Sequence, residues 1–480
     1  MQAQRWTLVV VCAATAMLML DIAVVNTALS RIAEDLNTGL SGLQWVVDAY
    51  TLALASVVLT AGSLADRLGR RRLFTIGLAL FTLASGLCAM AQDIVFLNTS
   101  RAVQGIGAAI MFAVSLALLA QAFPSPKERA GALAAYGATI GAAFAIGPLV
   151  GCLLTSGLDW QWIFLINIPI GAACLYITRT YVAESRDPNA HGVDWAGQVT
   201  LTAGLFLLVL ALLRGNEDGW TSTLILAELI GAAVALIAFV VVEMRTKQPM
   251  LPLRLFRDGS FTGAQITAFA ISASFFAIFL YVTLYLQQIL GLSAIEAGLV
   301  YLPGTLVMLV VSGATAQLGT KVSARTMISV GLGLVAVGMG LFMLAGTDSS
   351  WPILMPGFLV ASVGTGLFNP ALTHVALSSV SQDQSGVAAG VNDTFRQAGI
   401  AVGVAALGAL IPAEHAFGGD PGKYVSGMHD ALLAGGILAA VGALAGWFLI
   451  SKQYGAAAEA PAEGTEAATT ITPRPAYEAA

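Results

Sequence analysis

Residues 62–72 read Gly-Ser-Leu-Ala-Asp-Arg-Leu-Gly-Arg-Arg-Arg, a basic stretch between two long apolar runs, 44–63 and 73–91. The glycines at 62 and 69 permit a tight turn and a close backbone approach. Asp66 stands among arginines, so it can pair with one of them or lie at a helix N-terminus. Positive charge marks the cytoplasmic ends of membrane spans, but that rule explains neither the aspartate nor the glycines. We therefore expect a clasp that holds the cytoplasmic face shut in one conformation and opens in another.

The composition of the whole chain excludes several classes of protein. Of 480 residues, 57% are hydrophobic and 10% are charged, and the mean hydropathy is +0.82. Soluble proteins carry about a quarter charged residues. The chain is therefore predicted to be a polytopic membrane protein, not a soluble enzyme, a nucleic-acid-binding protein or a secreted disulfide scaffold. The four cysteines lie in apolar stretches and are expected to be free thiols, and the four histidines have no ligand spacing, so no metal site is predicted.

The apolar runs are about 20 residues long, which predicts membrane-spanning helices and not the roughly ten-residue strands of a barrel. Fourteen spans are expected, at 6–29, 44–63, 73–91, 95–121, 131–154, 162–181, 194–213, 223–243, 262–288, 296–317, 325–345, 351–378, 385–411 and 430–451. The first is interpreted as a retained helix, because no clear cleavage site follows it; the alternative is a signal peptide.

The basic residues predict that both termini are cytoplasmic. With the N-terminus inside, seventeen of the 22 Lys and Arg residues lie on the inner side. Three lie outside (Arg31, Arg214 and Lys423), and two lie within spans (Arg101 and Arg396). Residues 244–261 suit a cytoplasmic linker, and residues 452–480, rich in Ala, Glu, Thr and Pro, are predicted to form a disordered tail.

Several motifs carry a resemblance to a known family. Residues 62–70 resemble the cytoplasmic signature of the major facilitator superfamily, and Arg101 with Gln104-Gly105 resembles its fourth-helix motif. Gly147-Pro148-Leu149-Val150-Gly151 resembles the antiporter motif of the drug-exporter families, with Ala143 and Cys152 where glycine is usual. Four further stretches resemble the fourteen-helix drug:proton antiporter family: residues 20–29 (with Ala23 and Ser30 in place of the usual Thr and Pro), 44–50, 160–169 and 391–399.

The resemblance implies an all-α polytopic membrane protein with the major facilitator fold, two six-helix bundles plus two extra helices. The implied divisions are an N-terminal bundle (1–181), the extra helix pair (194–243), the linker (244–261), a C-terminal bundle (262–451) and the tail (452–480). It also implies a cytoplasmic gate motif of Gly62, Asp66, Arg67, Gly69 and Arg70. A tight helix interface that favours antiport is implied at Gly147, Pro148 and Gly151. Substrate binds between the halves near the middle of the membrane in such transporters.

Depth in the membrane supports one functional pair. Asp21 lies about 16 residues into an outward-running helix, or roughly 24 Å from its inner end. Arg101 lies about six residues into an inward-running helix, roughly 9 Å from its outer end. In a hydrocarbon core about 30 Å thick, Asp21 and Arg101 therefore lie at similar depth. An unpaired carboxylate is costly there, and its proton affinity would change when the pair separates. The alternatives are a purely structural ion pair, or an Arg101 side chain that reaches the outer interface.

Other polar and aromatic residues are weaker candidates. Asp393 is the second candidate proton carrier, although Arg396 shares its helix face and the two can simply neutralise each other. Asp48 lies near the outer end of its span and is expected to be a gate or wetted residue. Candidate cavity residues are Tyr50, Phe112, Tyr136, Phe144, Asn392 and Arg396; the alternative for the aromatic ones is core packing or contact with lipid.

These features together predict a proton-coupled exporter of amphipathic small molecules, such as antibiotics or lipophilic cationic drugs. The expected partners are the substrate, protons and the bilayer, with no cofactor or nucleic acid, in a monomer of the bacterial plasma membrane. Alternatives are a proton symporter for uptake and an exporter of one dedicated metabolite. A membrane-embedded enzyme or a sensor is disfavoured, since no nucleophile–base pair, metal cluster or output domain is visible.

Overall fold

The computed structural model describes residues 2–186, 192–319, 321–380 and 384–452, and these contain helices but no strand. The helices of the first half are α1 (Gln2–Asp35), α2 (Leu40–Leu68), α3 (Arg70–Ala89), α4 (Ile94–Ala122), α5 (Pro126–Gly157), α6 (Trp162–Leu165) and α7 (Asn167–Tyr181). Two more follow, α8 (Trp195–Asp218) and α9 (Thr223–Arg245). The rest are η1 (Leu253–Arg257), α10 (Gly259–Ile271), η2 (Ser272–Phe276), α11 (Ala277–Leu284), η3 (Tyr285–Ile289), α12 (Ala294–Leu318), α13 (Ala324–Phe342), η4 (Trp351–Leu354), α14 (Met355–Ser378), α15 (Ser385–Gly408), η6 (Ala413–His415) and α16 (Pro421–Leu449). The predicted tail lies outside the described residues, apart from Lys452.

Fourteen successive helical segments follow the predicted spans. Twelve are long and apolar enough to cross a membrane, and α5 is a thirteenth if its two bent halves are taken as one span. Helix α15 occupies most of the predicted span 385–411 but lies outside that set, and it carries the charged residues Asp393 and Arg396. The structure is therefore all-helical and compatible with the predicted count.

One predicted boundary was wrong. The stretch 62–72 is not a loop, because α2 runs to Leu68, α3 begins at Arg70, and only Gly69 breaks the helix, at φ +107°. Leu, Ala and Arg are good helix formers, so the helices extend beyond the apolar core. The predicted span 162–181 is confirmed as one candidate span, Trp162–Tyr181, with a break at Ile166 between α6 and α7. Pro169 explains this break, because it has no N–H to donate to the carbonyl four residues earlier.

The two halves of the chain repeat one packing pattern. Helix α4 packs against α2 and α3, and α14 packs in the same way against α12 and α13. Helix α1 packs against α5 and α7, as α10 does against α15 and α16. Glycines make the close approaches: a Cβ on Gly107 would lie 2.6 Å from the backbone nitrogen of Phe81, and one on Gly364 would lie 2.4 Å from the carbonyl oxygen of Gly331. The extra pair α8–α9 interrupts this repeat.

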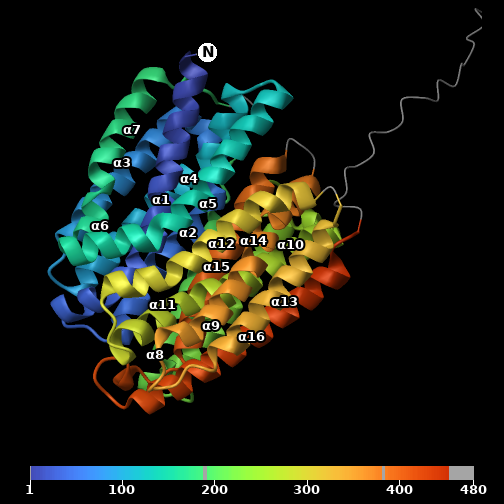
Figure 1. The fold of residues 1–480 in the computed structure, drawn as a ribbon. Coiled ribbons are helices and arrows are strands. Elements are labelled where there is room, and N and C mark those ends of the chain that lie inside the picture. The colour runs from blue at the N-terminus through green and yellow to red at the C-terminus, as the bar shows by residue number, and fades with distance from the viewer. Residues whose placement is uncertain (1, 187–191, 320, 381–383, 453–480) are drawn as a thin grey trace, which may run out of the picture.

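The halves meet along two helix pairs, α2 with α15 and α5 with α12. Figure 1 shows the first half, blue to teal, beside the second half, yellow to red. Helix α8 packs against both α2 and α15 and so touches both halves. On the side away from the N-terminus the halves are joined by hydrogen bonds, among them Gln44 Nε2 to Tyr281 Oη at 2.8 Å and Gln287 Nε2 to the carbonyl of Thr27 at 3.3 Å.

On the N-terminal side the halves enclose a cavity of about 1400 Å³. Its walls include the end of α2, the start of α15 and the segment between α9 and α10. The molecule is therefore closed on one side and hollow on the other.

The glycine contact between α13 and α14 generates a prediction about stability. Replacing Gly364 by Ala puts a methyl group against backbone, and overpacking of this kind costs about 1–3 kcal/mol. We expect the purified protein to melt at a lower temperature in detergent. Gly340→Ala on the same helix pair is the control, because nothing lies within 4 Å of its Cβ position. Equal melting temperatures for the two variants would contradict the packing argument.

Candidate functional site

Helix α4 holds Arg101 at membrane depth because its packing against α2 is close. Asp93 caps the helix by accepting a 2.8 Å hydrogen bond from the Phe96 backbone nitrogen. One turn after Arg101, a Cβ on Gly105 would lie 2.4 Å from the carbonyl oxygen of Tyr50, so only glycine allows this approach. Arg101 Nε therefore reaches α2 and donates to the carbonyl of Val46 at 3.0 Å.

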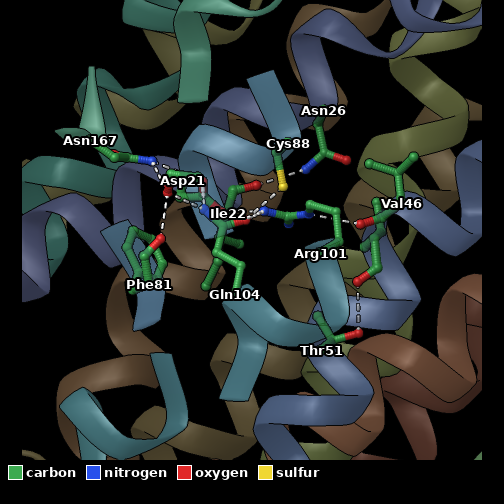
Figure 2. Close-up of polar contacts among 12 residues, drawn as sticks. Asp21, Ile22, Asn26, Val46, Thr51, Phe81, Cys88, Arg101, Gln104 and Asn167 are labelled. Carbon is green, nitrogen blue, oxygen red and sulfur yellow. Dashed lines mark hydrogen bonds and ion pairs between the residues drawn. The ribbon is translucent and has the colours of Figure 1, made fainter. Parts of the chain in front are cut away.

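The structure joins Arg101 to Asp21 of α1 in a buried ion pair, as Figure 2 shows. Arg101 Nη1 lies 2.5 Å from Asp21 Oδ2 and donates to Gln104 Oε1 at 2.6 Å. Gln104 Nε2 donates to Asp21 Oδ1 at 2.8 Å. Asp21 and Arg101 are each 2% exposed. Two charges so far from water are tolerated only when paired and fully hydrogen-bonded.

Helices α3 and α7 complete the network with residues that were not singled out from the sequence. Asn167 Nδ2 donates to Asp21 Oδ1 at 3.2 Å, and Ser85 Oγ accepts from Gln104 Nε2 at 2.8 Å. Cys88 Sγ lies 3.8 Å from Gln104 Oε1. The sequence signal was available only in part: Ser85 and Asn167 are polar residues inside apolar runs, but their convergence needs the packing of α3 and α7 on α1 and α4.

Aromatic rings cover the rest of the guanidinium group. The Arg101 Cζ atom lies 4.3 Å from the ring centre of Tyr50 and 5.7 Å from that of Phe164. Cation–π contact stabilises a guanidinium group that has little water around it. The remaining Nη2 group makes no hydrogen bond with the part of the chain that the structure describes.

A small cavity of about 60 Å³ lies next to Arg101 between the two halves. That volume holds a few water molecules and no drug-sized ligand. Tyr50 lines it, as expected, with Asn26 and Thr51. Its wall on the second half is aromatic, formed by Phe275, Phe276 and Phe279.

The other predicted cavity residues are placed differently. Phe112 lines the large cavity on the N-terminal side. Tyr136, Asn392 and Arg396 line neither of these two cavities. Tyr136 is buried in the packed core of the first half, and Asn392 Nδ2 donates to Gln265 Oε1 at 3.2 Å. The side chain of Phe144 lies outside the described residues.

Asp48 was expected to be a gate or a wetted residue, and its exposed fraction of 0% contradicts the wetted alternative. Both carboxylate oxygens are buried and have no hydrogen-bond partner among the described residues. The reason is that α2 packs against α15 at the closed side of the molecule, so the outer part of α2 faces protein and not water.

Asp393 and Arg396 make no direct ion-pair contact, although their charges are close enough to interact. Asp393 is buried in α15, and its Oδ1 accepts a long 3.5 Å hydrogen bond from Gln397 Nε2. Its Oδ2 has no partner among the residues that the structure places. Asp393 and Asp48 are thus two buried carboxyl groups without a hydrogen-bonded counter-ion.

At the predicted gate motif, Asp66 pairs with Arg70 across the α2–α3 junction, 2.8 Å from oxygen to Nη2. Arg67 is exposed. Glu184, a residue that sequence reasoning missed, accepts hydrogen bonds from the backbone nitrogens of Arg71 at 3.0 Å and Arg72 at 3.1 Å. A carboxylate at the N-terminus of α3 is favourable, because the first N–H groups of a helix have no partners in the helix itself. Gly62 lies within α2, and its Cβ position is open.

The predicted antiporter motif makes a close helix interface. A Cβ on Gly147 would lie 2.4 Å from Cβ of Ala23 in α1, and one on Gly151 would lie 2.3 Å from Oγ1 of Thr27. Helix α5 is bent by 44° between Gly131–Ala143 and Ile146–Gly157. Pro148 accounts for the bend, because it removes the N–H that would bond to residue 144.

The same segment of α5 also contacts the second half. A Cβ on Gly298 of α12 would lie 2.3 Å from Cys152 Sγ and 3.2 Å from the carbonyl oxygen of Pro148. Cys152, which replaces a usual glycine, therefore packs into space that Gly298 provides on the partner helix. The motif touches the Asp21 helix on one face and the opposite half on the other.

Two similar helical halves around a cavity, with a buried charge pair at membrane depth, define a membrane transport protein. The sequence profile of the Major Facilitator Superfamily matches residues 11–404, and the chain belongs to this superfamily. Its members are transporters and not enzymes, and the apolar helices make the chain a multi-pass membrane protein.

Similar proteins include named drug and antibiotic resistance transporters. The chain is 36% identical over 397 residues to the multidrug resistance protein Stp of Mycobacterium tuberculosis, covering 83% of this chain and 74% of that protein. It is 33% identical to the methylenomycin A resistance protein of Bacillus subtilis, over 94% of this chain and 95% of that one. The drug efflux pump JefA of Mycobacterium tuberculosis is 32% identical, with 85% and 81% covered.

The fold is also found among solved structures. The human organic anion transporter MFSD10 (TETRAN) matches with a TM-score of 0.61 and 16% identity, covering 92% of this chain and 99% of that one. At that identity the likeness shows the fold alone.

The buried ion pair generates a prediction about stability. Asp21→Asn or Arg101→Gln alone leaves one buried charge without its partner, which costs about 3–5 kcal/mol. The double variant removes both charges, so we expect it to lose less stability than the sum of the single variants. Thermal unfolding of the four purified proteins in detergent measures this coupling. Strictly additive losses would show that the two side chains do not interact.

Proposed function

We propose that this protein is a proton-coupled exporter of amphipathic small molecules such as antibiotics or lipophilic cationic drugs. The observation that carries the proposal is the buried Asp21–Arg101 pair beside a cavity between the two halves. A carboxylate at this depth is stable only while its donors surround it, so its protonation depends on how the helices are arranged.

The hydrogen-bond donors to Asp21 come from two helices other than its own, α4 and α7. A movement of α1 against α4 within the first half, coupled to the rocking of the two halves, leaves the carboxylate without its counter-ion, and Asp21 then takes a proton from the outside. Return to the paired arrangement releases the proton to the inside. Substrate leaves while the proton enters, which is antiport.

With both termini cytoplasmic, the 1400 Å³ cavity faces the cytoplasm and the present conformation is the one that loads substrate. The small cavity beside Arg101 must then widen before it can hold a drug-sized ligand. The Asp66–Arg70 pair and the Glu184 contacts belong to the inner gate, formed by Gly62, Asp66, Arg67, Gly69 and Arg70. Gly147, Pro148 and Gly151 let α5 move against α1 and α12 without steric hindrance.

Two further carboxyl groups are candidate proton carriers. Asp48 and Asp393 are buried without a hydrogen-bonded counter-ion, a costly environment for a carboxylate. Each lies in a helix of the α2–α15 interface between the halves. Asp21 remains the first candidate, because its partners can compensate its charge in one arrangement and not in another.

The names of the relatives support export: multidrug resistance, drug efflux and methylenomycin A resistance. We propose that the chain acts as a monomer in the bacterial plasma membrane, with the proton gradient as its energy source and no cofactor. An exporter of one dedicated compound is the second candidate, which the name of the cephamycin export protein of Amycolatopsis lactamdurans favours. That relative is 35% identical over 89% of this chain and 88% of its own length. Uptake by proton symport is the remaining alternative.

The first test is substrate-driven proton movement in proteoliposomes with a lumenal pH dye. When an antiported substrate enters an acidic lumen, protons leave and the lumen becomes more alkaline; a symported substrate would acidify it. We expect the antiport signal with a panel of antibiotics and lipophilic cations, and its loss in Asp21→Asn because the amide cannot carry the proton. Asp348→Asn, an exposed loop residue, is the control and should behave as the wild type. A signal that survives in Asp21→Asn would move the carrier role to Asp393 or Asp48.

The gate proposal has its own test. Arg70→Ala removes the partner of Asp66, and we expect the transport rate to fall because the α2–α3 junction at the wall of the inner cavity is no longer held by this pair. A surface pair at this spacing contributes only about 0.3–0.5 kcal/mol, so the yield of folded protein should not change. Arg72→Ala is the matched control, since its side chain is exposed and forms no ion pair with any described residue. Equal transport rates for both variants would exclude a gating role for this pair.

A further inference from the structure

A second pair of buried acidic residues lies far from Asp21 in the sequence, on the extra helices. Asp194 precedes the first residue of α8 and is 8% exposed, and Glu243 lies in the last turn of α9 and is 3% exposed. Both belong to the wall of the 1400 Å³ cavity. The transport proposal above uses neither of them.

Each carboxyl group has one oxygen in a hydrogen bond and one without a partner. Asp194 Oδ1 accepts from the backbone nitrogen of Gly197 at 2.8 Å, and Glu243 Oε2 accepts from that of Leu251 at 3.1 Å. Asp194 Oδ2 and Glu243 Oε1 are buried and have no partner among the described residues. Orphaned buried oxygens of this kind are rare in native proteins and call for a ligand or a proton.

The two orphaned oxygens both lie beside Gly197. A Cβ on Gly197 would lie 2.8 Å from Glu243 Oε1 and 2.9 Å from Asp194 Oδ2. The absence of a side chain at this position is what lets the carboxyl groups approach each other. Two full negative charges at such a place, away from water, repel each other strongly.

No described basic residue neutralises the pair. The charged residues that line the same cavity are Asp66 of α2, Arg70 of α3, Arg129 of α5, Lys247 after α9, and Arg254 and Arg257 of η1. None of them forms an ion pair with Asp194 or Glu243. Arg245 ends α9 and is exposed, and His191 lies outside the described residues.

We propose that Asp194 and Glu243 form a proton-binding site in which the two carboxyl groups share one proton. The protonated group donates to the orphaned oxygen of the other, which satisfies both oxygens and leaves a single negative charge. The site is separate from the Asp21 network and belongs to the helix pair that interrupts the twofold repeat.

The shared proton also fastens the linker between the halves. Glu243 holds the backbone of Leu251, and the neighbouring Met250 accepts a 3.7 Å contact from Thr60 Oγ1 of α2. Thr60 in turn bonds to Gln198 of α8. Loss of the proton would leave two carboxylates that repel each other, and this repulsion would break the hydrogen bond between Glu243 and Leu251. The linker therefore opens as the pH rises.

Hydrogen–deuterium exchange of the full-length protein in detergent tests this, read from the peptide around Leu251 between about pH 5.5 and pH 8.5 and corrected for the intrinsic exchange rate. One proton released on opening makes protection fall about tenfold per pH unit between the titration points of the open and the closed form, and protection becomes constant above the higher of the two. We expect that slope in the wild type and its loss in Glu243→Gln and in Asp194→Asn. Asn remains a good helix N-cap, so the second variant keeps α8 intact.

Two controls separate this site from other titrating groups. Asp393→Asn and His191→Gln should keep the wild-type slope. A flat wild-type profile, a slope that survives in both Glu243→Gln and Asp194→Asn, or a slope lost with His191→Gln would overturn the proposal. Protection that follows the Na⁺ or K⁺ concentration at fixed pH would also overturn it, because the ligand would then be a metal cation. None of these outcomes depends on transport activity.

Discussion

The ion pair between Asp21 and Arg101 is the constraint around which the first half is built. A guanidinium and a carboxylate that are both 2% exposed need partners on every side, and four helices supply them: α1, α3, α4 and α7. Those helices can come close enough only because glycines such as Gly105 and Gly107 lie at their contacts. The hydrogen bonds of the ion pair therefore require the close helix contacts that the glycines permit. For the same reason the pair is sensitive to movement of one helix against another.

The second half repeats this packing without repeating the charge pair. Helix α14 approaches α12 and α13 through glycines, as α4 approaches α2 and α3, but aromatic rings occupy the region that faces Arg101 across the small cavity. One half thus presents a charge and the other an apolar wall. Such a surface suits amphipathic molecules, because few polar contacts fix orientation while the rings bury apolar area. The superfamily to which the chain belongs uses paired halves of this kind to alternate access.

Buried carboxyl groups without a hydrogen-bonded counter-ion lie at contacts between separate parts of the fold. Asp48 and Asp393 lie in the two helices that join the halves, and Asp194 and Glu243 lie where the extra helices meet the linker. A static core rarely keeps such groups, since each costs free energy that an apolar residue would not. Their positions agree with the proposed role in proton coupling. Of the two extra helices, α8 touches both α2 and α15 and therefore both halves.

Hydropathy and charge in the sequence were enough to predict an all-helical membrane protein, the approximate spans and the depth match of Asp21 with Arg101, because one-dimensional spacing translates directly into height along a helix. The same arithmetic cannot give the direction in which a side chain points around the helix. For that reason the sequence left Asp48 as a gate or a wetted residue although it is fully buried, and left open whether Asp393 pairs with Arg396, which it does not contact directly. Ser85 and Asn167 joined the site, and Asp194 met Glu243, only through packing. The sequence determined the depth of each side chain along its helix. The tertiary structure decided the direction of the side chain around the helix axis and the residues that it contacts, because close glycine contacts select which faces of the helices meet.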